Sequence, residues 1–160
     1  MKISEGVEWA AHACALLAAV PEGGALSAGA IAAFNDLPKA YMAKHLQALA
    51  KAGVVVSVRG AQGGYRLARP PAEISLWDVR RAIEGPGPDF HCANIRLKGP
   101  CVAPKPSSGP CAIAHAFWEA ERAYQAALGS MTIADVVVQA AREQDAEGLS
   151  RIAAWLRAAL

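Results

Sequence analysis

Residues 41–69 read YMAKHLQALAKAGVVVSVRGAQGGYRLAR, and this stretch decides the fold. Its first half predicts a helix, because Met42, Leu46 and Leu49 recur at i, i+4 and i+7 and form one apolar stripe. Gly53 is placed to end this helix in a left-handed conformation. The stretch therefore opens with an amphipathic helix that turns one face toward a core.

The second half of the stretch predicts a β-hairpin. A β-branched run over 54–58 is followed by a glycine-rich reversal over 60–64 and then by YRLAR. Pro70 and Pro71 close the hairpin. A further helix is expected over 75–85, with a serine as its cap and a glycine as its end.

Upstream of this stretch, the sequence predicts two more helices. The first runs over about 4–19 and is broken by PEGG at 21–24. Ser27 caps a short helix over 28–34, and NDLP at 35–38 is a turn that leads into the next helix. Short helices, a turn and a glycine-tipped hairpin make a winged helix-turn-helix, whose second helix enters the major groove of DNA.

The distribution of charge supports a nucleic-acid partner. The 160-residue chain has a net charge of only +2. From residue 36 to 80, however, seven Lys or Arg stand against three Asp or Glu, a net of +4, whereas residues 111–147 carry a net of −4. A basic middle and an acidic tail indicate two tasks in one chain.

The candidate DNA contacts lie on the helix and hairpin of the opening stretch. With the apolar stripe inward, the helix presents polar side chains that neutralise phosphate or, in the case of glutamine, pair with adenine. Two arginines flank the hairpin tip and face the DNA backbone or minor groove. These residues are Lys39, Tyr41, Lys44, Gln47, Lys51, Arg59 and Arg66.

Residues 86–110 differ from the rest of the chain. They form a long loop rich in glycine and proline, and loops of this length tend to be functional. Cys92 and Cys101 lie in the loop, and Cys111 lies at its edge. A long helix over about 111–128 follows, apolar enough to pack against another helix, and two further helices complete the chain.

The sequence thus predicts a mainly α-helical protein with one small β-hairpin. Residues 1–85 form the winged helix-turn-helix domain; the family resemblance given below implies that its first helix also faces a metal cluster. Residues 86–110 form the cysteine loop, and residues 111–160 carry the long dimerisation helix and the C-terminal helices.

Several classes of protein are disfavoured. No convincing export signal and no apolar run of about 18–20 residues is present, so we expect a cytoplasmic protein without membrane contact. Cysteines stay reduced in that compartment, and clustered ones indicate metal or redox chemistry. The cysteine spacing does not match a zinc knuckle. We expect no enzyme, since neither a nucleotide-binding glycine fingerprint after a strand nor a Ser–His–Asp set is suggested.

Residues 41–85 closely resemble the winged-helix core of the bacterial IscR/NsrR/RsrR family of iron–sulfur regulators, and AGVVVSVRGAQGGYRLAR is the most specific part. The resemblance implies a homodimer that binds double-stranded DNA sequence-specifically at a palindromic operator, most often as a repressor. It also implies an iron–sulfur cluster held by cysteines of the loop, although the cysteine spacing here is wider than is usual in the family.

The RsrR branch is the most similar, because it pairs a glutamate and a histidine near the N-terminus with two cysteines. By that likeness, Cys92 and Cys111 of one subunit and Glu8 and His12 of the other hold a 2Fe–2S cluster. Glu8 and His12 are one helical turn apart, so both reach a single point. Cys101 remains open as a spare thiol, a third ligand to a 4Fe–4S cluster or a repair residue, and His115 as a replacement for His12.

The expected ligand set predicts how the cluster is used. Replacing thiolate by nitrogen or oxygen raises the cluster potential, so the predicted function is a regulator whose DNA affinity follows the cluster's redox state. Two alternatives stay open: a nitric-oxide- or iron-responsive regulator with a 4Fe–4S cluster, and a cluster-free winged-helix regulator that senses through thiols. Cys14, within the first apolar helix, is expected to be a buried structural residue.

Overall fold

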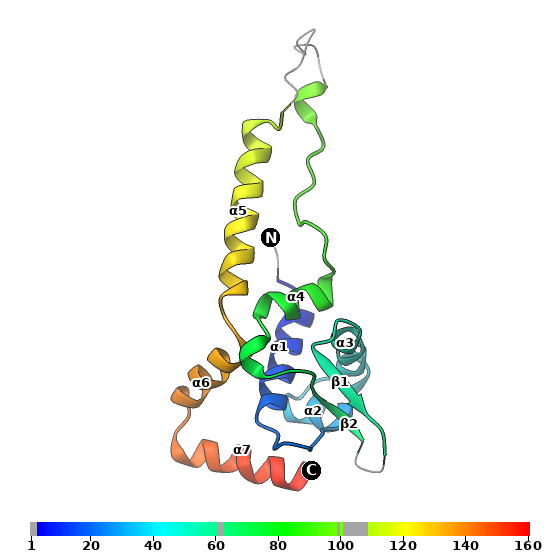
Figure 1. Cartoon of the computed structure of the whole chain (residues 1–160), viewed down its shortest axis with the longest axis vertical. Helices are drawn as coiled ribbons and strands as arrows, with labels where there is room; N and C mark the ends of the chain where they lie inside the picture. Colours follow the sequence, from blue (N-terminus) through cyan, green and yellow to red (C-terminus); the bar gives the residue numbers. More distant parts are fainter. Residues whose placement is uncertain (1–2, 61–62, 99, 101–108) are drawn as a thin grey trace.

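The computed structural model describes residues 3–60, 63–98, 100 and 109–160. Within these residues the chain is mostly helical and contains one two-stranded antiparallel sheet, as predicted (Figure 1). The elements are α1 (Glu5–Ala18), α2 (Ala28–Phe34), α3 (Lys39–Lys51), β1 (Val55–Val58), β2 (Gly64–Leu67), η1 (Pro71–Glu73), α4 (Leu76–Glu84), η2 (Ile95–Leu97), α5 (Ala112–Gly129), α6 (Ile133–Glu143) and α7 (Ala146–Ala159).

Local signals place the ends of the first helices where the sequence predicts them. The Ser27 hydroxyl accepts a hydrogen bond from the Ala30 amide at 3.1 Å and so caps α2. Gly53 follows α3 with φ of 72°, in the left-handed region. Pro38 is the N-cap of α3, so the NDLP turn leads directly into this helix, as predicted.

The hairpin is fixed to the helical body by a short backbone bridge. β1 pairs with β2 from Val55 opposite Leu67 to Val58 opposite Gly64. Beyond it, Leu26 and Tyr65 exchange two backbone hydrogen bonds of 2.8 and 3.0 Å. The Leu26 backbone lies so near β2 that a Cβ at Gly64 would be 2.3 Å from the Leu26 carbonyl oxygen. Glycine is therefore required at this position of the wing.

One apolar core unites the N-terminal elements. α1 packs against α3, α4 and α6, and α2 packs against α3. The predicted stripe of α3 is fully buried in this core, as are Ile31 of α2 and Val79 of α4. Each side chain of this size contributes about 1.5–3 kcal/mol when removed from water, so α3 is held rigidly by its inner face.

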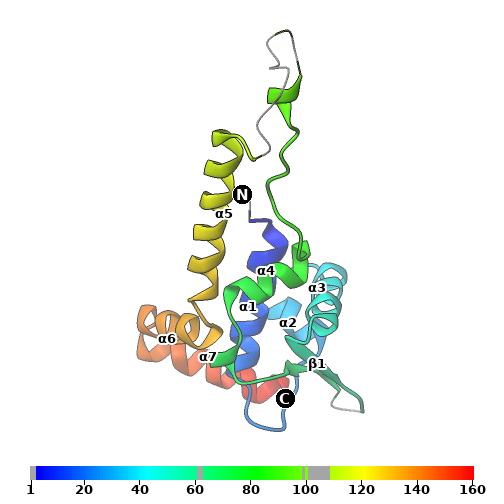
Figure 2. The same ribbon diagram turned by 45° about the horizontal axis from the view of Figure 1, so that its top comes forward.

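The segment after α4 leaves this body. The described part of the loop and α5 run side by side away from the core in both views (Figures 1 and 2). Two backbone hydrogen bonds attach the chain after the C-terminal end of α5 to the start of α4. The Leu76 amide donates to the Met131 carbonyl at 2.9 Å, and the Ile133 amide donates to the Ile74 carbonyl at 2.8 Å. α6 and α7 then return to the body, where Trp155 packs edge-on against Phe34.

Candidate nucleic-acid interface and metal-ligating residues

The outer face of α3 is polar and open to solvent. The inner stripe of this helix is buried, and every predicted DNA contact on the helix is exposed: Lys39, Tyr41, Lys44, Gln47 and Lys51. Arg59, directly after β1, and Arg66, on β2, are exposed as well. The structure therefore presents a helix with cationic and amide groups beside a wing that carries two arginines, as the sequence predicts.

Two cations of the basic middle segment are occupied within the protein. Arg69 forms an ion pair with Asp78 at 3.1 Å, and Arg80 is buried and paired with Glu84 and Asp89. The net charge of +4 over this segment therefore overstates what it offers to DNA. The lysines of α3 and the arginines of the wing are the groups that remain on the surface.

An aromatic contact joins α1 to the outer end of α3. Trp9 meets Tyr41 edge-on with ring centroids 6.2 Å apart, and it meets His45 in the same manner at 5.9 Å. Burial, followed by the nearby Lys44 charge, lowers the pKa of His45. Trp9 directly follows Glu8, so the helix with the predicted oxygen and nitrogen ligands touches the predicted recognition helix.

Glu8 and His12 lie one turn apart on α1, and both side chains are exposed. Within the described part of the chain, neither side chain makes a hydrogen bond or an ion pair. His12 also lines a groove between α1 and α6, whose other walls include Met131 and Val136. The two predicted ligands are thus free to bind a group that approaches from outside the subunit.

Cys92 and Cys111 lie toward the two ends of the loop, and both are half-buried. Cys111 is the N-cap of α5, where its sulfur accepts a hydrogen bond from the Ala114 amide at 3.4 Å. That hydrogen bond is the main cause of a lowered pKa of the Cys111 thiol, and the Arg96 charge acts in the same direction. The thiolate is the form of cysteine that binds metals.

The three remaining residues, Cys101, His115 and Cys14, differ in where the structure places them. Cys101 lies outside the described residues. His115 is exposed on α5 and lies 3.7 Å from Glu119, with which it forms an ion pair when protonated. Cys14 is fully buried in the core, and burial raises the pKa of its thiol to about 12. The prediction that Cys14 is buried in the core is confirmed.

A single subunit does not assemble the predicted ligand set. Among the described residues, no group of three or more His, Cys, Asp or Glu side chains is arranged to hold a metal ion. The cysteines belong to the protruding loop and α5, whereas Glu8 and His12 belong to α1 of the body. The two cysteines and the glutamate–histidine pair therefore lie on different parts of the subunit.

The outer part of α5 carries apolar side chains with little cover. Ile113 is 69% exposed and Phe117 is 52% exposed. Phe90 of the loop stacks on Phe117 at 4.8 Å and contacts Trp118, but it leaves this face of the helix open. Exposed apolar patches of this kind mark interaction surfaces.

Comparison with known proteins now identifies the fold and its class. The family model of the Rrf2 regulators, described as iron-dependent transcriptional regulators, matches residues 3–139. The chain belongs to the Rrf2 family. A relative from Mycobacterium tuberculosis, named as an HTH-type transcriptional regulator, is 35% identical over 148 residues, which cover 92% of this chain and 88% of the relative.

Solved structures agree with this assignment. CymR, the global cysteine regulator of B. subtilis, has a TM-score of 0.70 and 27% identity, with 87% of this chain and 98% of CymR covered. IscR of T. potens has a TM-score of 0.68 and 30% identity, with 94% and 96% covered. The chain is therefore a winged-helix, DNA-binding transcriptional regulator of the Rrf2 family. In the described residues, the helices are too short or too polar to cross a bilayer.

Proposed function

We propose that this Rrf2 regulator is a homodimeric, sequence-specific repressor whose affinity for DNA depends on the redox state of a bound 2Fe–2S cluster. The observation that carries the proposal is the separation of the ligands. Two thiols belong to the protruding loop and α5, and an exposed glutamate–histidine pair one turn apart belongs to α1. Each half is incomplete alone, and two copies together supply four donors.

The chemistry of the donors fits such a cluster. Cys111 has a lowered pKa, which favours the thiolate, and Cys92 is a second partly accessible thiol, at the other end of the loop. Glu8 and His12 supply oxygen and nitrogen, both competent ligands for iron. The family description as iron-dependent regulators supports iron as the metal. We therefore assign Cys92 and Cys111 of one subunit and Glu8 and His12 of the partner as the ligands.

When bound, a 2Fe–2S cluster with two non-thiolate ligands would supply a one-electron centre of raised potential. The protein residues would hold α1 of one subunit against the loop of the other. Because Trp9 contacts Tyr41 and His45, any shift of α1 reaches α3 directly. A dimer reads two half-sites about one helical turn apart, so a small change in the spacing of the α3 helices changes affinity.

The proposed DNA contacts follow from the exposed face of α3 and the wing. Lys44 and Lys51 would neutralise phosphates, Gln47 would pair with a base edge, and Arg59 and Arg66 would contact the backbone. Two-fold symmetry of the dimer implies a palindromic operator. Lys44→Ala should weaken binding to all sequences and flatten its salt dependence, whereas Arg157→Ala on α7 should change neither.

The proposed dimer contact is the exposed apolar face of α5. Phe117→Ala removes a side chain that is 52% exposed in the monomer, so it should weaken self-association without unfolding the subunit. Sedimentation velocity over a range of concentrations measures this effect. Leu149→Ala on α7, also an exposed apolar side chain, is the matched control and should leave the dimer intact.

Absorption spectroscopy of anaerobically purified protein tests the cluster assignment. A 2Fe–2S centre gives structured visible bands that bleach on reduction. Alanine at Glu8, His12, Cys92 or Cys111 should each change the spectrum, whereas Cys14→Ala should not. Loss of the cluster in Cys101→Ala would contradict this ligand assignment. Iron-free protein that still binds DNA would leave the thiol-sensing alternative, with Cys111 as its reactive group.

A further inference from the structure

Arg80 of α4 is a buried cation at the junction between the body and the loop. Its side chain is only 4% exposed, and its guanidinium lies 5.0 Å from the centre of the Trp77 ring. Nε forms an ion pair with Glu84 at 2.9 Å, and Nη1 donates to the Gly85 carbonyl at 3.3 Å. The remaining nitrogen, Nη2, is hydrogen-bonded to the Asp89 carboxylate. One side chain therefore binds the end of α4 and the first residues of the loop together.

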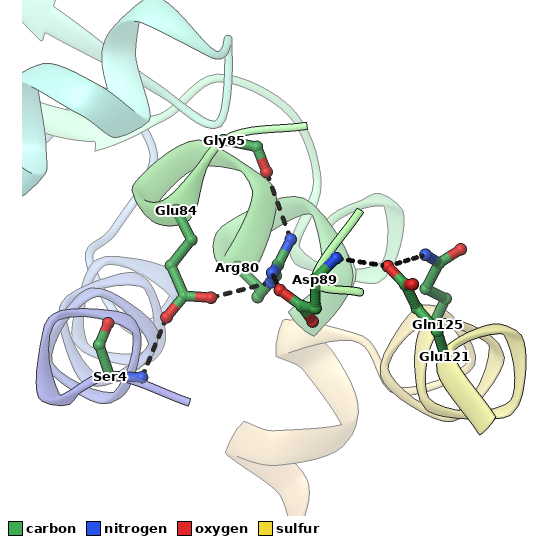
Figure 3. Close-up of polar contacts among 7 residues, drawn as sticks. All are labelled: Ser4, Arg80, Glu84, Gly85, Asp89, Glu121 and Gln125. Carbon is green, nitrogen blue, oxygen red and sulfur yellow. Dashed lines mark hydrogen bonds and ion pairs between the residues drawn. The ribbon is translucent and has the colours of Figure 1, made fainter. Parts of the chain in front are cut away.

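The same network continues into two other elements (Figure 3). The Asp89 amide donates to Glu121 Oε1 of α5 at 2.7 Å. On the other side, Glu84 Oε1 accepts from the amide of Ser4, directly before α1, at 3.0 Å. A continuous chain of polar contacts thus runs from α1 through α4 and the loop to α5, with Arg80 at its centre.

The charges in this network make its geometry depend on Arg80. The carboxylates of Glu84 and Asp89 both pair with the Arg80 guanidinium, and the buried Glu121 carboxylate accepts from the Asp89 amide. Carboxylates removed from water are tolerated only when they are paired or hydrogen-bonded. Without Arg80, Asp89 would lose its cation next to Glu84 and Glu121, and repulsion would move the loop away from α4.

We infer that Arg80 is a positioning residue that transmits the state of the loop to the winged helix. The inference rests on the proposed function, since the loop is the segment that carries the two cysteine ligands. Arg80 lies on α4, which packs against both α1 and α3. A displacement of the loop at Asp89 is passed through Arg80 to α4, and through Glu84 to the start of α1. Arg80 itself touches neither the ligands nor the DNA-facing side chains.

The test measures coupling rather than binding alone. The full-length protein, with its cluster assembled anaerobically, is titrated with a short duplex that the wild type selects from a random library. The measured quantity is the ratio of affinities in the oxidised and reduced states. Arg80→Met and Asp89→Asn should each lower this ratio by about 2- to 30-fold while the visible spectrum persists. Arg81→Met, an exposed neighbour on α4, is the matched control and should keep the wild-type ratio.

A second measurement is independent of the cluster. In cluster-free protein, hydrogen–deuterium exchange follows peptides that contain Ser4 and Asp89, whose amides are held by Glu84 and Glu121. Arg80→Met should speed exchange in both peptides by about 2- to 30-fold, and Arg81→Met should not. Asp89→Asn replaces Arg80→Met in both measurements if the latter fails to fold, since it leaves α4 unchanged.

The outcomes separate the two proposals. An unchanged affinity ratio in Arg80→Met, in a protein whose wild type responds to its cluster, overturns the coupling role. If the DNA affinity of the wild type is the same in the oxidised and reduced states, the proposed function fails. Hydrogen–deuterium exchange in cluster-free protein then decides whether Arg80 positions the junction. Faster exchange at both Ser4 and Asp89 then still supports Arg80 as the residue that positions the junction, and unchanged exchange overturns it.

Discussion

The body of this regulator and its protruding arm, which we define as residues 86–98, 100 and 109–129, differ in how they cover apolar side chains. In the body, Met42, Leu46 and Leu49 are fully buried, and the hairpin is fixed by backbone hydrogen bonds to Leu26. In the arm, Ile95 is 75% exposed and Ile113 is 69% exposed. The apolar stripe of α3 is thus covered within the subunit, whereas these two side chains of the arm are open to solvent. The difference makes the exposed apolar side chains of the arm the candidate surface for self-association.

The contrast extends to electrostatics. In the body, Arg69 pairs with Asp78, and Arg80 pairs with Glu84 and with Asp89 at the start of the arm. In the arm, Cys111 has a lowered pKa and remains partly accessible. A reactive thiol on an accessible arm, joined to a tightly packed DNA-binding domain, is suited to sensing a chemical signal. Substitutions and probes placed in matched pairs on the two regions measure how far this contrast holds.

The largest contrast is expected between the two cysteines. In cluster-free protein, iodoacetamide should modify Cys111 at least about a thousandfold faster than Cys14 at neutral pH, because Cys14 is fully buried and reacts only after unfolding. The hydrogen bond from Ala114 lowers the pKa of Cys111, so its thiolate persists to lower pH than that of an unstructured peptide. Mass spectrometry of tryptic peptides over a pH series measures both rates. A midpoint above that of a cysteine peptide would contradict the expected direction.

Leucine-to-alanine substitutions give the next largest difference. Leu46→Ala, fully buried in α3, should lower the free energy of unfolding by about 2–5 kcal/mol, because it removes apolar contacts and leaves a cavity. Leu97→Ala in the arm, where the side chain is 43% exposed, should change it by less than about 0.5 kcal/mol. Chemical denaturation followed by circular dichroism measures both values. Equal losses would show that the arm is as tightly packed as the body.

Much of the body could be predicted from the sequence because local signals determine it. Ser27 caps α2, the α3 stripe is buried, Gly53 takes a left-handed conformation, and Gly85 ends α4 with φ of 91°. Each of these features depends on residues within one turn or one hairpin. The fold followed from them, together with the resemblance of residues 41–85 to known regulators.

The rest depends on contacts between distant segments, which periodicity does not encode. Nothing in the sequence marks Trp9 as the contact between α1 and α3. Arg80 counts as one more surface cation in the sequence, yet it is buried against acids of α4 and the loop. The predicted cluster site combines two subunits, and the open candidate Cys101 lies outside the described residues, so a single chain neither completes nor excludes the site.

Glycine-to-alanine substitutions probe the same contrast through the backbone. A Cβ at Gly64 would lie 2.3 Å from the Leu26 carbonyl oxygen, so Gly64→Ala must push β2 away from its neighbour. We expect a loss of about 1–3 kcal/mol in the free energy of unfolding. A Cβ at Gly87 in the arm meets nothing within 4 Å, and Gly87→Ala should be neutral or slightly stabilising. Thermal unfolding of both variants tests this, and a stable Gly64→Ala protein would contradict the close approach.

The smallest expected effect separates two serines at helix ends. The Ser75 hydroxyl accepts from the Asp78 amide at 3.1 Å, and the Asp78 carboxylate accepts from the Ser75 amide at 3.0 Å, which completes a capping box. Ser75→Ala should therefore cost about 1 kcal/mol of stability. Ser130→Ala, at the C-terminal end of α5, removes only an exposed hydrogen bond to the Ala127 carbonyl and should cost a few tenths of a kcal/mol.

Because Asp78 also pairs with Arg69, the Ser75 variant should destabilise the chain after β2 together with α4. Hydrogen exchange in peptides covering 64–69 would register that second effect, and unchanged exchange there would show that the ion pair holds without the cap.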